Sequence, residues 1–182
     1  IGGLMVITLV FMVAFAMMQA MAALLWKNIY SLSESEVGYM FAFIGLVAFI
    51  IQGGLIGWFQ QRISDKMLLF YGSLLVGTGL TGLSLVPVEI FIPVEFIFIV
   101  CMSLGVAFFS PTMSNLLSKM VSSDDQGSIL GVNQGVSSLG RVVGPPLGGV
   151  LYSINYHVPF ISGGITMAMV ATSVLIFLAK RK

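Results

Sequence analysis

The amino-acid sequence predicts an all-α membrane protein, folded as one bundle of six transmembrane helices without a separate soluble domain. The first observation is composition: 58% of the 182 residues are hydrophobic and only 8% are charged, whereas an ordinary soluble domain has about 25% charged residues. With a mean hydropathy of +1.05, the chain has too little charge to cover a soluble surface and too much apolar surface to be disordered. The second observation is that apolar runs recur at the length of about 20 residues that crosses a bilayer as a helix.

Six runs reach that length, and the short linkers between them hold most of the charges. The runs cover residues 4–25, 37–58, 67–86, 92–116, 127–152 and 158–179. The sequence lacks the alternating apolar and polar segments of transmembrane β-barrels, so each run is predicted to be a helix. The chain begins with Ile1, without Met, and enters the first run at once, so we expect it to be part of a longer protein.

The distribution of Lys and Arg predicts how the bundle is oriented. If the runs alternate in direction, Arg62, Lys66, Lys119 and the basic tail at 180–182 lie on one side, and Lys27 alone lies on the other. Because short linkers rich in Lys and Arg stay in the cytoplasm, we expect both ends of the chain there. The net charge of +1 provides no basic field for nucleic acid, so no nucleic-acid partner is expected.

The run at 127–152 contains regularly spaced glycines and a Gly-Pro step. They are Gly131, Gly140, Gly144, Pro145, Gly148 and Gly149. Three of them, Gly140, Gly144 and Gly148, recur every four residues and form a smooth face that lets another helix approach closely. Pro145 removes a backbone hydrogen bond, so we expect a bend there. The spacing leaves two interpretations open: packing of one helix on another, or a gate at which two bundles rock.

Several polar or polarizable residues inside the runs are candidates for lining a substrate cavity. They are Thr8, Met12, Phe15, Gln19, Gln52, Ser110, Asn115, Gln134 and Arg141. The first four follow the i, i+4, i+7, i+11 spacing of one helix face. A cavity lined by Met, Phe, Gln and Ser suits an amphipathic organic compound, although packing against lipid or a neighbouring helix is an equally good interpretation for each residue singly. Unpaired amides are costly in lipid, which favours Gln19 and Gln52 as cavity residues.

Arg141 is the only basic residue inside a run, about 21 Å along its helix from Gly127 at 1.5 Å per residue. A charge at that depth costs at least about 2.5–3.5 kcal/mol on insertion scales, so it should face protein, water or headgroups. We expect no acidic residue in the core of any run. A carboxylate partner would then come from a second half of the protein or from the outer residues Glu89 and Glu95. A structural role between two halves, a role in substrate or proton coupling, and a place among headgroups all stay open.

These motifs resemble the major facilitator superfamily, and in particular its drug:proton antiporter branch, which includes tetracycline-efflux proteins. The glycines with the Gly-Pro step are similar to the antiporter motif of that branch, best known in span five and echoed in span eleven of these twelve-span proteins. Residues 57–66 are similar to the cytoplasmic loop signature G-x-L-x-D-R-x-G-R-K, because Gly57, Arg62 and Lys66 match it, whereas Asp65 replaces a basic residue. Such a degenerate copy is typical of the second half of the family. The resemblance therefore implies half of a major facilitator fold, spans seven to twelve.

The resemblance also implies a function. The protein would be a secondary active transporter that expels a small amphipathic compound or drug in exchange for protons, by alternating access, in the inner (plasma) membrane of a bacterium. Its expected partners are membrane lipid, the small-molecule substrate, protons, and a second six-helix half in the same polypeptide or in a partner chain. Uptake of a small metabolite is one alternative, and a half-length homodimer or membrane scaffold without transport activity is another.

An enzyme is not expected from this sequence. It has no phosphate-binding loop, and the G-x-G-x-x-G pattern at 77–82 lies inside an apolar run, where glycines pack helices. It has a single cysteine, Cys101, and no cluster of nucleophilic or metal-ligating residues. We therefore expect no catalytic residues, no cofactor and no metal.

Overall fold

The computed structural model describes residues 1–179, and every long element in that range is a helix. The helices are α1 (Gly2–Asn28), α2 (Glu34–Ile50), α3 (Ile56–Arg62), α4 (Asp65–Leu83), α5 (Phe91–Ser118), α6 (Gln126–Ile154) and α7 (Val158–Ala179), with the short turns η1 (Ile51–Leu55), η2 (Val88–Ile90) and η3 (Ser123–Asp125). The predicted all-α fold is confirmed. The basic tail at 180–182, which was used above to orient the bundle, lies outside the described residues.

Five helical stretches in the described chain are long and apolar enough to cross a membrane: α1, the continuous stretch from α2 through α3, α4, most of α5, and α7. The sixth predicted run forms α6, which has 29 residues. At 1.5 Å per residue this helix is also long enough to span a bilayer. It falls outside the apolar set because glycines and polar side chains occupy much of its length.

Local sequence signals explain where the helices begin and end. α2 starts at a capping box, in which the Glu36 amide donates to Ser33 Oγ at 3.3 Å and the Ser33 amide donates to the Glu36 carboxylate at 2.7 Å. η1 is a π-helical turn that joins α2 to α3 without interrupting the helical stretch. α4 ends at Leu83, three residues before the predicted end at 86. The reason is Pro87, because the residue before a proline is disfavoured in a helix.

Glycines bring α4 into close contact with two neighbouring helices. A Cβ atom added to Gly72 would lie 2.9 Å from the carbonyl oxygen of Gly105 in α5, and one added to Gly77 would lie 3.3 Å from the carbonyl oxygen of Gly164 in α7. Gly77 opens the G-x-G-x-x-G pattern. That pattern lies inside α4 and serves helix packing.

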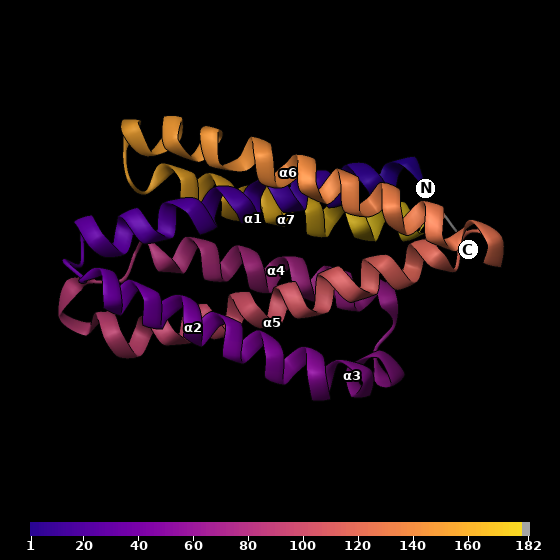
Figure 1. The fold of residues 1–182 in the computed structure, drawn as a ribbon, viewed down its shortest axis with the longest axis horizontal. Helices are drawn as coiled ribbons and strands as arrows, with labels where there is room; N and C mark the ends of the chain where they lie inside the picture. Colours follow the sequence, from indigo (N-terminus) through magenta and orange to yellow (C-terminus); the bar gives the residue numbers. More distant parts are fainter. Residues whose placement is uncertain (180–182) are drawn as a thin grey trace.

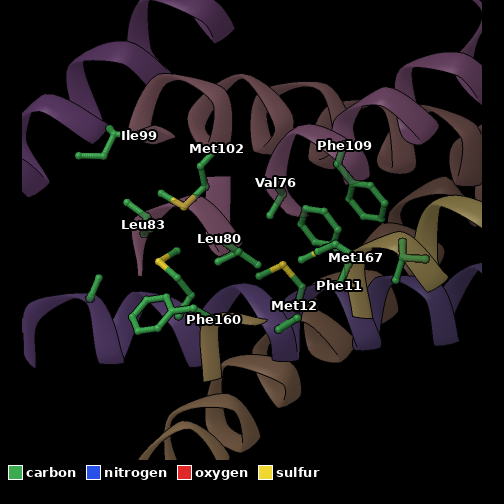
Figure 2. Close-up of a cluster of buried hydrophobic side chains, with 14 of the residues drawn as sticks. Phe11, Met12, Val76, Leu80, Leu83, Ile99, Met102, Phe109, Phe160 and Met167 are labelled. Atoms are coloured by element: carbon green, nitrogen blue, oxygen red, sulfur yellow. The ribbon is translucent and has the colours of Figure 1, made fainter. Parts of the chain in front are cut away.

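The apolar core is formed by α1, α4, α5 and α7 (Figure 2). Leu80 of α4 is fully buried among Met102 of α5 and Met167 of α7 in this cluster. Phe11 of α1 stacks on Phe109 of α5 with ring centroids 3.6 Å apart and ring planes within 2° of parallel. Methionine side chains adapt to irregular spaces, which suits a core that four helices share.

α6 and the stretch from α2 to α3 lie at opposite edges of the bundle (Figure 1). α6 packs mainly along α1, whereas α2 contacts mainly α5. Only 11% of the apolar window of the α2–α3 stretch is buried. Its exposed large side chains include Tyr39, Phe49 and Trp58. A helix with so little buried surface needs lipid or further protein around it.

Ion pairs mark the two ends of the bundle. Lys119 after α5 pairs with Asp65 at the start of α4, with 3.0 Å between the nitrogen and oxygen atoms. The N-terminus lies at this end (Figure 1). At the other end, Lys27 pairs with Glu34 at 3.0 Å. The second and fourth linkers therefore share one end, as alternating spans require.

Candidate functional site

A polar cavity of about 120 Å³ lies between α1, α5 and α6. It is lined by Thr8, Met12, Phe109, Ser110, Met113, Ser114, Asn133, Gln134, Ser137 and Arg141. The α1 residues come from the part of that helix nearer the N-terminus, and the α5 residues from the part nearer Ser118. Because α1 and α5 are otherwise apolar, this concentration of hydroxyl, amide and guanidinium groups is the best candidate for a binding site.

Two buried oxygen atoms in the cavity have no hydrogen-bond partner among the described residues: Thr8 Oγ1 and Asn133 Oδ1. Thr8 is 3% exposed and Asn133 is 8% exposed, so bulk water does not satisfy them fully. The hydroxyl of Ser137, one turn further along α6, donates a hydrogen bond to the backbone carbonyl oxygen of Asn133 at 2.9 Å. Buried polar groups are normally paired, so these two oxygens are placed to receive hydrogen bonds from a ligand or an ordered water.

The spaced glycines of α6 pack on α1 next to the cavity, although none of them lines it. A Cβ atom added to Gly140 would lie 2.7 Å from Met12 Cβ, and one added to Gly148 would lie 2.9 Å from Met17 Cγ. At Gly144 the nearest atoms belong to the α1 backbone. The smooth glycine face is therefore filled by a helix of the same bundle, which supports the packing interpretation. A role for these glycines as a gate stays a prediction.

Arg141 lies at the exposed side of the cavity. It makes none of the ion pairs found among residues 1–179. A guanidinium carries five N–H donors and is always charged. The cavity therefore combines one fixed positive charge with neutral donors and acceptors, which is an arrangement for binding an anionic or polar group.

Glu95 lies near the start of α5, at the end of its run and not in the core of that run, but it is buried there. Its side chain is fully buried in α5, and one carboxylate oxygen accepts a hydrogen bond from Trp26 Nε1 of α1. Trp26 lies fourteen residues beyond Met12, which is about 21 Å along α1. Glu95 is therefore too far away to be the carboxylate partner of Arg141, a role that the sequence analysis had left open for it.

The structure gathers five of the nine predicted cavity residues and leaves four outside. The five in the cavity are Thr8, Met12, Ser110, Gln134 and Arg141. Of the others, Phe15 is partly buried against the core, Asn115 is half-buried near the end of α5, and Gln19 and Gln52 are exposed. The two glutamines that sequence reasoning favoured most thus lie on exposed helix faces, outside the cavity.

Sequence reasoning missed Asn133 and Ser137. The buried residues of α6 are Asn133, Ser137, Gly140, Gly144 and Gly148, at i, i+4, i+7, i+11 and i+15. Extending the glycine face backwards by two helical turns would have found both polar residues.

The remaining motif residues lie apart from the cavity. Gly131 and Gly149 are exposed, and a Cβ atom on either would meet nothing within 4 Å. Pro145 is half-buried, and α6 runs unbroken through it and Pro146. No described contact gives Gly131 or Gly149 a packing role within this bundle.

Residues 57–66, which are similar to the cytoplasmic loop signature, lie at the end of the bundle that carries the second linker. The Arg62 guanidinium lies over the Trp58 ring, 4.2 Å from its centroid, a cation–π contact. Asp65 pairs with Lys119. Lys66 is half-buried, and Gly57 has open space around it. Asp65, which departs from the family signature, is thus the residue that ties α4 to the end of α5.

Metal-binding chemistry has no support in the part of the chain that the structure describes. No group of three or more His, Cys, Asp or Glu side chains comes together there. The cavity itself contains no carboxylate or thiolate. Its side chains can bind and orient a small molecule through hydrogen bonds and one positive charge.

Comparison with known proteins agrees with this architecture. The model of a family described as Major Facilitator Superfamily matches residues 4–182. Solute carrier family 22 member 18 of Mus musculus is 32% identical over 164 residues, which are 88% of this chain and 38% of that protein. Multidrug resistance protein 2 of Bacillus subtilis is 27% identical over 168 residues, 87% of this chain and 39% of that protein. Solute carrier family 67 member A1 of Homo sapiens is 29% identical over 164 residues, 88% of this chain and 37% of that protein.

The chain spans less than two fifths of the length of these curated relatives. Its helices are consistent with half of the family's fold. The apolar helices make it an integral, multi-pass membrane protein. The family match covers nearly the whole chain and is to transporters, not to enzymes. On this evidence the chain belongs to the Major Facilitator Superfamily.

Proposed function

We propose that this chain is one half of a secondary active transporter that exports a small amphipathic organic compound in exchange for protons, by alternating access. The observation that carries the proposal is the cavity between α1, α5 and α6. It places unpartnered oxygens of Thr8 and Asn133 beside the charged Arg141 within a membrane-spanning bundle. A buried polar site between helices is what a transported molecule requires on its way across the bilayer.

Export is supported by the relatives and by the composition of the cavity. Two relatives from Bacillus subtilis are named multidrug resistance proteins. Met12, Phe109 and Met113 supply apolar and polarizable surface beside the polar groups, which suits a substrate with an apolar body and a polar end. Whether the protein belongs to the drug:proton antiporter branch, and to its tetracycline-efflux-like members, is part of the same proposal.

A second six-helix half is the proposed partner of the exposed side of α6. Gln134, Ser138 and Arg141 are exposed on this helix. An arginine facing lipid at this depth would cost at least about 2.5–3.5 kcal/mol, so protein or a water-filled space must cover it. The weakly buried stretch from α2 to α3 provides a second, more apolar surface for that half or for lipid. A second copy of this chain is the alternative occupant.

The proposed orientation places the end with Arg62, Lys66 and Lys119 in the cytoplasm of a bacterial cell, with the protein in the inner membrane. These three basic residues belong to linkers that the Asp65–Lys119 ion pair joins at one end. Among the described residues, Lys27 is the one basic residue at the other end, and it is paired with Glu34. This asymmetry follows the positive-inside rule.

The test is transport by the full-length protein in inverted membrane vesicles, with and without a proton gradient. Arg141→Ala removes one charge-assisted interaction, worth about 1.5–3 kcal/mol, so apparent substrate affinity should fall at least about tenfold. Ser153→Ala, which is exposed on the same helix and lies outside the cavity, is the matched control and should transport normally. Unchanged transport by Arg141→Ala would contradict the proposal that this cavity binds the substrate. A transport rate that is the same with and without the proton gradient would contradict proton coupling.

Uptake of a small metabolite is the second candidate, because the mammalian relatives are named solute carriers. The same vesicles separate the two directions. Export in cells becomes gradient-driven accumulation inside inverted vesicles, whereas an uptake protein accumulates its substrate in right-side-out vesicles.

A further inference from the structure

Glu95 is a buried acid that the cavity and the proposed transport path do not use. It lies in the second turn of α5, and both Glu95 and Trp26 of α1 are 0% exposed. Trp26 Nε1 donates to Glu95 Oε1 at 2.5 Å. The second carboxylate oxygen, Oε2, has no hydrogen-bond partner among the described residues. This contact joins two helices at residues 69 positions apart in the chain.

The surroundings of this pair are aromatic and contain no buried cation in the described chain. Trp26 packs edge-on against Phe41 of α2 at 5.3 Å between ring centroids. Tyr30, just after α1, stacks on Phe91 of α5 at 3.8 Å. The charged and titratable groups that the neighbouring elements place at this end are Lys27, Tyr30, Glu34, Glu36, Tyr39, Glu89, Tyr152, Tyr156 and His157. Lys27, the only lysine or arginine among them, is exposed and paired with Glu34.

Tyr30 is a titratable neighbour of Glu95, and burial is the main cause of its raised pKa. Burial, and then the negative charge of Glu95 and the nearby Tyr156, raise the pKa of Tyr30 to about 12. Its hydroxyl therefore stays protonated at physiological pH and donates to the Val86 carbonyl oxygen at 2.7 Å. Tyr30 can neither neutralise Glu95 nor supply it with a positive charge.

An ionised carboxylate without a cation is expensive to bury, whereas a neutral carboxylic acid is not. We propose that Glu95 is a proton-binding site that couples protonation to the packing of α1 against α5. While the two helices are packed, the acid is neutral and still accepts the Trp26 bond through Oε1. When the helices separate and water reaches the carboxyl group, the proton passes to water and the carboxylate is solvated.

Two cavities lie near Glu95 in the chain, at the end of the bundle that carries Lys27, and neither is lined by Glu95 or Trp26. A cavity of about 360 Å³, lined in part by Tyr30, Glu89 and Pro93, lies beside the first turn of α5. A second, of about 170 Å³, is lined in part by Glu36 and Phe96. Pro93 and Phe96 flank Glu95 in sequence. A small opening between α1 and α5 would therefore expose the carboxyl group to water.

This proton site differs in place from the Arg141 cavity, since Trp26 lies about 21 Å along α1 from Met12. It does not rest on the proposed efflux function, because a proton can bind here whether or not transport is proton-coupled. Protonation should favour the packed arrangement of α1 and α5, and deprotonation should favour their separation.

The test uses tryptophan fluorescence of the full-length protein carrying Trp58→Phe, titrated from about pH 5 to about pH 9, a range that begins near the pKa of a free glutamate. The Trp26 signal is the difference between this parent and the same protein with Trp26→Phe. We expect the Trp26 emission to change reversibly with pH as one group titrates. Glu95→Gln keeps the acceptor oxygen but cannot ionise, so it should abolish the change completely. Glu89→Gln, the exposed matched control, should leave it intact.

The proposal is overturned if Trp26 emission is flat with pH in the parent, or if Glu95→Gln titrates as the parent does. Should Glu95→Gln not yield folded protein, Glu95→Asp retains the acid on a shorter side chain. Its titration midpoint must then differ from that of the parent, and an unchanged midpoint also overturns the proposal. None of these readouts measures transport, so a failure here is distinct from a failure of the proposed function.

Discussion

Replacing Gly144 by alanine should force α6 away from α1, because the contact there is backbone against backbone. The new methyl group would lie 2.8 Å from the Met17 amide nitrogen and 2.8 Å from the Val13 carbonyl oxygen. Neither atom can move by a rotamer change. Ordinary contact begins near 3.4 Å, so the helices must separate by about 0.6 Å. Overpacking of this kind costs about 1–3 kcal/mol.

The assay is unfolding of the full-length protein in detergent, by heat and by titration with a denaturing detergent. Gly144→Ala should lower both midpoints. Gly149→Ala is the matched control on the same helix, because its methyl group meets nothing within 4 Å. That variant should be unchanged or more stable by up to about 1 kcal/mol, since alanine favours helices. If the two variants have equal stability, the close α1–α6 contact does not exist as described.

Three further changes test other parts of the structure. Tyr30→Phe should lower the free energy of unfolding by about 0.5–1.5 kcal/mol, because the hydrogen bond to the Val86 carbonyl oxygen is lost. Because the folded pKa of Tyr30 is raised from 10.0 to about 12, its stabilising contribution is complete below pH 10 and is lost as pH rises towards 12. A pH series of unfolding midpoints should show that loss in the parent and not in Tyr30→Phe. Lys119→Ala removes the ion pair with Asp65 and should lower the free energy of unfolding by about 0.2–1 kcal/mol. If this loss is as large in high salt as in low salt, the pair is not partly exposed as described. Thr8→Val removes a buried hydroxyl without a partner, so stability should hold or rise while substrate affinity falls; a stability loss above about 1 kcal/mol would show that the hydroxyl is paired.

The fold followed from the sequence to a large extent because hydropathy and charge act locally. Each apolar run became a helical stretch, and the shift of the end of α4 to Leu83 has a local cause in Pro87. The predicted glycine face of α6 is also present in the structure, because residue spacing fixes which side chains share a helix face. What spacing did not reveal was which helix fills the glycine face, since α1 lies more than 100 residues earlier in the chain.

The site was harder to predict, because it depends on which faces meet. Gln19 and Gln52 were favoured on the cost of amides in lipid, yet both are exposed, and their environment depends on whatever surrounds this bundle. Glu95 was expected at the outer end of its run, and nothing in the pattern of that run indicated that its side chain is buried. Its burial depends on Trp26, 69 residues away. A one-dimensional pattern records neither of these relationships.

The close pairing of α1 with α6 also has a consequence for how this chain is made. α4 and α5 are neighbours in sequence and can pair as soon as both leave the ribosome and enter the bilayer. α1 ends at Asn28 and α6 begins at Gln126, so α1 must wait for about 100 further residues before its glycine-bearing partner is synthesised. During that interval Thr8 and the α1 backbone that later contacts Gly144 face lipid, the insertion machinery or a chaperone. The bundle is therefore completed late in synthesis, when α6 and then α7 pack against the earlier helices.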